Sequence, residues 1–360
     1  MADWTKSMTQ TYEFYRVDPA TWEDDEVVET ILSCTINRDS TTDTLGSATI
    51  DCTEVLDECY IRVYLKIIQN GITERFPLGT FLVQTPSVSF DGKVKTITMD
   101  GYTPLIELKG VRPPLGYTIL KKAGDTKTQI MPTVSAICRE NMRAPVVESD
   151  FTKTLRDDFV ADLNDNWMTY LQSLASMAEY EISLDEMSRV IFQPQRLLGA
   201  MKPVWTYDDG NSSILHADIK EERDLYSVPN VVEVIYSTPS SYLYSKVVNK
   251  SKDSPISTVN RGRQVVYRDT SPSFAGEPTQ EILDAYAKNL LKNLSSLERK
   301  VTYKHGYCPV RLGDCVVLDY LRAGLENVRA RVISQSISCT TGCVVEETAV
   351  YTENLWDGGE

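Results

Sequence analysis

Four cysteines and a histidine near the C-terminus are the residues whose types are best suited to hold a metal ion. Thiolate and imidazole groups are ligands that Zn²⁺ prefers in proteins. No two of these cysteines have the CxxC spacing of common zinc sites, and Cys315 opens an apolar Cys-Val-Val-Leu run in which a free thiol acts as a small hydrophobe. The spacing therefore favours core packing over a zinc site. The candidate ligands are His305, Cys308, Cys315, Cys339 and Cys343.

The segment DLNDN at 162–166 has side chains that could begin a calcium-binding loop. Such a loop needs a glycine at its sixth position and a glutamate at its twelfth. This chain has Trp167 and Ser173 at those positions. The segment therefore predicts the N-cap of a helix rather than a calcium site.

The common catalytic motifs are absent from the sequence. His216 and His305 are the only histidines, neither lies in HExxH, and no GxSxG, Walker A or Rossmann glycine motif is found. Adjacent carboxylates on a strand would point to opposite faces, so they are poor catalytic pairs. We expect no catalytic residue, no cofactor and no enzymatic activity. The adjacent carboxylates are Asp24-Asp25, Asp157-Asp158 and Asp208-Asp209.

The length of 360 residues allows two or more domains, each with its own core. No stretch is apolar over the roughly 18 residues that a membrane helix needs, and the first residues lack the pattern of a secretory signal. We therefore expect synthesis in a cytoplasm, where the eight cysteines would be free thiols.

The negative charge is concentrated near the N-terminus. Residues 1–60 hold 14 acidic and 3 basic side chains, which accounts for most of the net charge of −14. This balance argues against a nucleic-acid-binding surface, which needs basic groups to neutralise phosphates. The region is either a solvated acidic surface or a surface that lies near DNA without binding it.

Residues 1–110 predict a consecutive antiparallel β domain. The dipeptides Asn70-Gly71 and Asp91-Gly92 each lie between two β-type runs and are typical of hairpin turns with positive φ at both central positions. In the second arm of the later hairpin, Ile97 and Met99 share one face and Thr96 and Thr98 the other.

The rest of the chain predicts helices set between further strands. Apolar spacing indicates helices over about 127–142, from Trp167 to Ala178 with an Asn164/Asp165 cap, and over about 277–297. The apolar stripe of the last helix consists of Ile282, Leu283, Tyr286, Leu290, Leu291 and Leu294. Strand-like runs occupy 179–195 (a hairpin), 201–270 and four segments between 299 and 351.

Three segments, in this order, resemble the phage tail hub family, which is related to the hub part of type VI secretion spikes. The chain is similar to that family in a PLGTF-like strand leading into a hairpin, a helix followed by a short hairpin, and a helix, strand and Gly-Asp turn. The turn is Leu312–Asp314, and we expect Leu78–Phe81 and Leu312–Asp314 to be fold-defining turns. The segments are FPLGTFLVQTPSVSFDGKVKTITMDGYTPLIEL, WMTYLQSLASMAEYEISLDEMSRVIFQPQ and AYAKNLLKNLSSLERKVTYKHGYCPVRLGDCVVLDY.

The resemblance implies an α+β, mostly β chain with two tube-like antiparallel β-barrel domains and smaller α+β domains inserted between and within them. The implied domains are a first tube domain at 1–110, an outer domain at 111–200, a second tube domain at 201–236 plus 299–352, an inserted segment at 237–298 and a tail at 353–360.

The resemblance also implies a structural role in the baseplate of a virion tail. Three chains would form a pseudo-hexameric ring that matches a six-fold tail tube to a three-fold spike. The implied partners are two further copies of the chain, the tail tube or distal tail protein above, a spike or tail-tip protein below, and other baseplate proteins at the outer domains. Genome DNA would pass through without specific binding. The alternatives are a distal tail adaptor forming a hexameric ring and a tail-associated wall-degrading enzyme.

Overall fold

The computed structural model describes residues 2–122, 127–148, 153–238, 241–272, 274 and 278–359. The chain divides into two compact units. Unit 1 consists of Met1–Ile219 and Tyr303–Thr348, and unit 2 of Lys220–Thr302 and Ala349–Glu360. Among the described residues, no helix is both long and apolar enough to cross a membrane.

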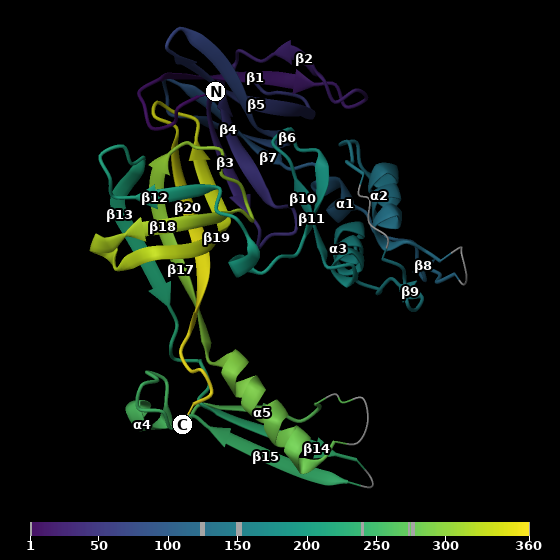
Figure 1. Ribbon diagram of the computed structural model, residues 1–360. Helices are drawn as coiled ribbons and strands as arrows, with labels where there is room; N and C mark the ends of the chain where they lie inside the picture. The colour runs from purple at the N-terminus through teal and green to yellow at the C-terminus, as the bar shows by residue number, and fades with distance from the viewer. Residues whose placement is uncertain are drawn as a thin grey trace. The chain divides into compact units, whose positions relative to one another are not determined.

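The largest sheet has thirteen strands and includes strands from both ends of the chain (Figure 1). Its main path runs β13-β17-β20-β19-β3-β4-β7-β6-β5-β1-β2, and β18 joins β19 and β12 beside that path. The predicted α+β class with a predominance of strand is confirmed. The strands from the N-terminal end are β1 (Thr9–Val17), β2 (Asp24–Val27), β3 (Ile31–Asp39), β4 (Gly46–Cys52), β5 (Cys59–Gln69), β6 (Ile72–Phe90) and β7 (Lys95–Tyr102). The others are β12 (Trp205–Asp208), β13 (Leu215–Arg223), β17 (Ser296–Gly306), β18 (Cys315–Tyr320), β19 (Leu325–Ser338) and β20 (Val344–Asn354).

The two halves of this sheet have the same strand order. In the first half the order is β3-β4-β7-β6-β5, and in the second it is β13-β17-β20-β19-β18. Taken along the chain, the first to fifth strands of one set correspond to the first to fifth strands of the other. The halves differ in the next strand, since β1 pairs with β5 antiparallel whereas β12 pairs with β18 parallel. The chain therefore contains an internal repeat of five strands.

The halves are joined edge to edge by main-chain pairing. Antiparallel β3 and β19 place Thr35 opposite Ser338 and Asp39 opposite Ser334. At the centre of this seam Ile36 lies opposite Ile337, and both are fully buried in one core cluster. Strands from both halves of the sheet supply that cluster, so the halves share a core. The two halves, β3–β7 and β13 with β17–β20, are called the first and second repeat units below.

The two predicted hairpins form, with different turns. The Asn70-Gly71 hairpin closes through a two-residue turn in which both residues have positive φ, as predicted. At the other hairpin only Gly92 has positive φ, because the loop between Phe90 and Lys95 spans four residues. There the Asp91 carboxylate accepts hydrogen bonds from the main-chain N–H groups of Lys93 and Val94. The prediction of a two-residue turn at 91–92 was wrong, since side-chain capping competes with the tighter turn.

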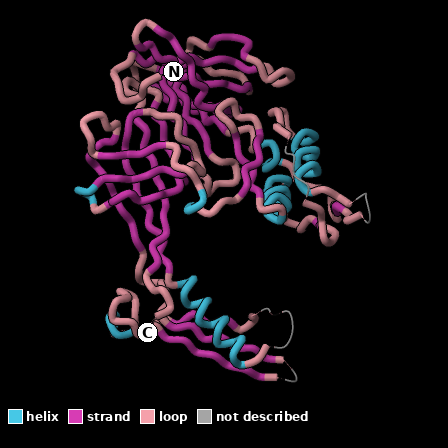
Figure 2. Tube along the Cα trace, in the orientation of Figure 1, coloured by secondary structure: helices cyan, strands magenta, loops and turns pink. Residues whose placement is uncertain are grey.

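Three helices and two small strand pairs occupy the segment between the two halves (Figure 2). Helix α3 is capped by Asn166, whose side chain accepts from the Thr169 N–H, rather than by the predicted Asn164 or Asp165. The DLNDN segment is thus a helix start, as predicted. The elements are α1 (Ile106–Gly110), β8 (Thr118–Ile119), α2 (Ile130–Asn141), β9 (Phe159–Val160), α3 (Trp167–Met177), β10 (Tyr180–Leu184), β11 (Val190–Pro194) and η2 (Leu198–Ala200).

Most of unit 2 lies in the chain between β13 and β17, and within it α5 packs along β14 and β15 (Figure 1). Leu283, Ala287 and Leu291 form the buried stripe of α5, whereas Ile282 is 50 % exposed. The prediction that Ile282 belongs to this stripe was wrong, because Leu283, the next residue along the helix, faces the sheet. The elements are β14 (Val231–Ser237), β15 (Tyr242–Val248), α4 (Thr258–Arg261), β16 (Val266–Asp269) and α5 (Gln280–Leu294), and η3 (Leu321–Ala323) lies in unit 1. The finer division into five segments stays a prediction.

Candidate functional site

The PLGTF segment forms a bulge inside β6 and not the turn expected from the sequence. Gly79 pairs with Val63 and Pro77 with Tyr64, so Leu78 is the extra residue of the bulge. Gly79 has φ of +152°, and a Cβ there would lie 2.7 Å from the Phe81 ring. Glycine is required at position 79 because the Phe81 ring packs directly against its backbone.

The Leu-Gly-Asp segment is a true turn, as expected. Gly313 has φ of +82°, and the Asp314 carboxylate accepts from the Arg311 N–H at 2.9 Å. Main-chain bonds of Gly313 and Asp314 with Val332 fix the turn to β19. Burial raises the pKa of Asp314.

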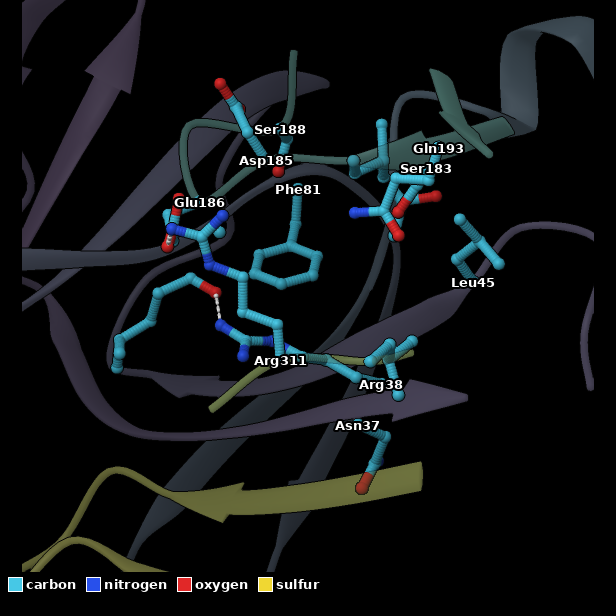
Figure 3. Close-up of a pocket in the computed structure, with 15 residues that line it drawn as sticks. Asn37, Arg38, Leu45, Phe81, Ser183, Asp185, Glu186, Ser188, Gln193 and Arg311 are labelled. Atoms are coloured by element: carbon cyan, nitrogen blue, oxygen red, sulfur yellow. Dashed lines mark hydrogen bonds and ion pairs between the residues drawn. The ribbon is translucent and has the colours of Figure 1, made fainter. Parts of the chain in front are cut away.

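The structure brings the two motif segments together at one small cavity (Figure 3). In Figure 3 the Phe81 ring lies between the β10–β11 turn, represented by Asp185 and Ser188, and the side chains of Arg38 and Arg311. An ion pair between Arg311 and Glu186 links the Gly-Asp turn to the β10–β11 turn. The cavity volume is about 60 Å³. This is far below the roughly 300 Å³ of a small-molecule site, so the cavity is a junction of segments from β3, β6, the β10–β11 hairpin and the Gly-Asp turn.

Thr80 attaches the β10–β11 turn to β6. Its N–H donates to the Ser188 hydroxyl at 2.7 Å, and its own hydroxyl donates to the Met187 carbonyl at 3.1 Å. The same hydroxyl accepts from Nε of Arg62, which is 1 % exposed and forms an ion pair with Asp24 at 2.7 Å. Buried polar groups of this kind are costly unless all are paired, so the geometry of the contact is tightly specified.

A buried polar network crosses from the first repeat unit to the second. Arg38 on β3 donates to the Leu78 carbonyl at 2.7 Å and to Oε1 of Gln335 on β19 at 3.0 Å. Nε2 of Gln335 in turn donates to the Val310 carbonyl at 3.0 Å and to Glu347 on β20 at 2.6 Å. Burial lowers the pKa of Arg38. The network therefore ties the bulge of one repeat unit to the core of the other.

His305 and Cys308, two of the candidate metal ligands, lie at the inner end of this network. His305 is fully buried, its Nδ1–H donates to the Gly306 carbonyl at 2.7 Å, and Nε2 lies 3.6 Å from Glu347 and 3.1 Å from the Tyr207 hydroxyl. Burial alone would lower the pKa of His305, but hydrogen bonding to Cys308 and Glu347 and the nearby carboxylate charge outweigh it and raise the pKa to about 10.

The other three candidate ligands lie elsewhere. Cys339 is beside Cys34 at the β3–β19 seam, where its N–H donates to the Cys34 carbonyl at 2.9 Å. Cys315 and Cys343 are fully buried. Among the described residues, no three His, Cys, Asp or Glu side chains are arranged to hold a metal ion. All eight cysteines fall within the described part of the chain and are free.

The arrangement of His305 and Cys308 suits a structural role. The Cys308 sulfur lies 3.9 Å from His305 Nδ1, which is a pairing found in thiol nucleophiles, but the two side chains are 2 % and 0 % exposed. A substrate could not reach them without opening the core. The groups are arranged to hold strands together and to neutralise one another within the sheet.

No protein-family model matches the chain, and no curated protein matches its sequence. Solved structures do match. A tail protein from Neisseria meningitidis MC58 is 11 % identical over 96 % of this chain and 98 % of that chain, with a TM-score of 0.58. The 43 kDa tail protein of prophage MuSo2 from Shewanella oneidensis is 10 % identical over 95 % of this chain and 98 % of that chain, with a TM-score of 0.63. The chain has a phage tail protein fold.

The tail protein fold confirms the resemblance read from the three motif segments. Two of those segments also meet in the structure, since Gly79 of the bulge and Leu312 of the Gly-Asp turn line one cavity. Arg38, Gln335 and Glu347 were not predicted as site residues from the sequence. A signal for Glu347 was present, because it lies two residues from each of the apolar Val345 and Ala349 along β20. It therefore falls on the buried face that they share.

Proposed function

We propose that this chain is a structural component of a virion tail, specifically a homotrimeric baseplate hub. The single observation that carries the proposal is the internal repeat. One chain supplies two five-strand units with the same strand order, joined edge to edge. Three such chains would present six similar units around a ring, which suits a position between a six-fold tube and a three-fold spike.

The tail protein fold over nearly the full chain supports this proposal. The partners would be two further copies of the chain, the tail tube or distal tail protein above, the spike or tail-tip protein below and other baseplate proteins at the outer segments. DNA would pass through the ring unbound. The acidic side chains exposed in residues 1–60 agree with such a passage, although Asp24 and Glu13 are already paired with Arg62 and Lys66.

The proposal also holds that the chain is not an enzyme. The His305, Cys308 and Glu347 groups are used within the buried network and serve the stability of the strands. A peptidoglycan-clearing assay with the purified chain tests this directly, and clearing above a heat-inactivated control would overturn it.

Single-particle imaging of the purified chain, alone and mixed with the neighbouring tail proteins, tests the ring. We expect a closed ring with three-fold symmetry, six similar lobes around a channel. A ring of six chains would favour the distal tail adaptor instead. A compact particle without a channel under both conditions would contradict both ring functions.

A further inference from the structure

The seam within the chain indicates how two copies could join. At that seam β18 pairs with residues 325–331 of β19, and β3 takes the following stretch, 334–338. Strand β3 therefore continues along β19 where β18 ends. The repeat relates β19 to β6 and β3 to β13. A second seam of the same kind would place β13 of one copy on β6 of another.

The matching stretch of β6 is an open edge. Strand β5 pairs with β6 from Ile72 to Val83, and β7 pairs with it from Leu82 to Phe90. Among the described strands, no other strand pairs with β6. From Gln84 onward β6 is therefore hydrogen-bonded along one edge alone. Pro86 lies in this stretch, as is typical of an edge strand, because proline cannot donate to a ladder.

The free edge of β6 has exposed apolar side chains in the stretch that corresponds to the buried part of β19. Along β19, Ile337 is fully buried against Ile36 of β3. Along β6, the polar–apolar alternation Ser87–Phe90 places Val88 and Phe90 on one face, and they are 53 % and 68 % exposed. Two large apolar groups side by side on a free sheet edge favour a partner strand.

Strand β13 has the pattern that such a partner needs. Leu215, Ala217 and Ile219 alternate with the polar His216 and Asp218, so the strand has one apolar face. It is the terminal strand of the sheet, paired with β17 alone among the described strands. Its position in the second repeat unit is that of β3 in the first, and β3 already uses its outer edge for the seam.

We propose that β13 of one copy pairs antiparallel with Ser87–Phe90 of β6 in the next copy, as β3 pairs with β19 within one chain. The face of Ala217 and Ile219 then covers Val88 and Phe90. The pairing is head to tail, so three copies close into a ring in which seams within and between chains alternate. This inference rests on the proposed ring and names its contact.

The experiment compares self-association of the full chain with that of Val88→Asp/Phe90→Asp, by analytical ultracentrifugation and imaging. Burying a carboxylate at the seam should weaken ring formation at least about tenfold. Leu115→Asp is the matched control, because Leu115 is an 86 % exposed apolar residue in the loop before β8 and should leave the ring intact. Equal circular dichroism spectra of the three proteins would show that the monomer still folds.

Crosslinking gives a second readout. Copies carrying Val88→Cys mixed with copies carrying Ala217→Cys should give a covalent dimer with a short thiol–thiol crosslinker, whereas neither copy alone should. Replacing Val88→Cys by Leu115→Cys should abolish the product. A three-fold ring that tolerates both aspartates and yields no crosslink would overturn the seam and leave the proposed hub standing. A chain that never forms a ring, alone or with tail proteins, would overturn both.

Discussion

At the scale of single residues, buried polar and charged side chains connect the two repeat units. Arg38, Gln335 and Glu347 form a chain of hydrogen bonds across strands of both units, and His305 lies at its end. A buried hydrogen-bonded network specifies one arrangement of strands, because any slip leaves polar groups unpaired. The residues that looked most like a metal site are partly absorbed into this network.

Replacing Glu347→Gln should lower the free energy of unfolding by about 2–4 kcal/mol. The change removes the charge beside His305 and one of the acceptors of Tyr303 and Gln335. Urea unfolding followed by fluorescence measures it. Glu346→Gln is the control, since Glu346 forms a half-exposed pair with Lys304 and should cost no more than about 0.5 kcal/mol. Equal losses in the two variants would show that the buried charge is unimportant.

The raised pKa of His305 predicts a pH dependence of stability. Because the folded state holds the proton up to about pH 10 and the unfolded state releases it near 6.5, this stabilisation is complete below pH 6.5 and declines as the pH rises toward 10. The difference in melting temperature between the native chain and His305→Asn should therefore shrink between about pH 6.5 and 9. A difference that stays constant over this range would contradict a charged His305.

At the scale of elements, alternation and turn dipeptides predicted the strands well. Strands β5, β6 and β7, the hairpin β10–β11 and the four C-terminal strands lie where period-two patterns placed them. The bulge at Leu78 could not be predicted, because a bulge is defined by the register of β6 against β5. Local sequence indicates a strand, but pairing with a distant segment decides where an extra residue is accommodated.

Gly79→Ala should destabilise unit 1 by about 1–3 kcal/mol. The φ of +152° is unfavourable for alanine, and the added Cβ would meet the Phe81 ring. Calorimetry of the variant measures the loss. Gly110→Ala is the control, because that position is open and lies at the end of α1, so a change within about 0.5 kcal/mol is expected. A Gly79 variant as stable as the control would refute the role given to the bulge.

At the scale of the whole molecule, the resemblance implied two tube-like domains, but the strand-by-strand repeat lay beyond what the sequence patterns could reveal. Strand order depends on which distant segments pair, and the corresponding strands of the two halves follow a common periodicity without a common sequence. The strand-like runs at the two ends of the chain were visible in the sequence, but the seam between β3 and β19 was not. The same limit applies to the cavity, since the segments that line it are far apart in the chain.

Among the described residues, each of four core clusters draws on one unit alone, which predicts two thermal transitions. Two core clusters draw their buried residues from unit 1, and two others draw theirs from unit 2. Ile36→Ala should lower the transition of unit 1 and Leu283→Ala that of unit 2, each by removing a fully buried side chain at about 2–5 kcal/mol. Differential scanning calorimetry resolves the two. If each substitution shifted the whole profile, the units would form a single cooperative block.

The place where unit 2 enters the chain has a practical consequence. It follows β13, and the corresponding point in the first half is the connection between β3 and β4, whose tip exposes Thr41 and Thr42. The β13–β17 connection thus contains most of a folded unit while the sheet on either side of it is intact. The plain connection is a natural grafting position for a reporter peptide or an affinity tag.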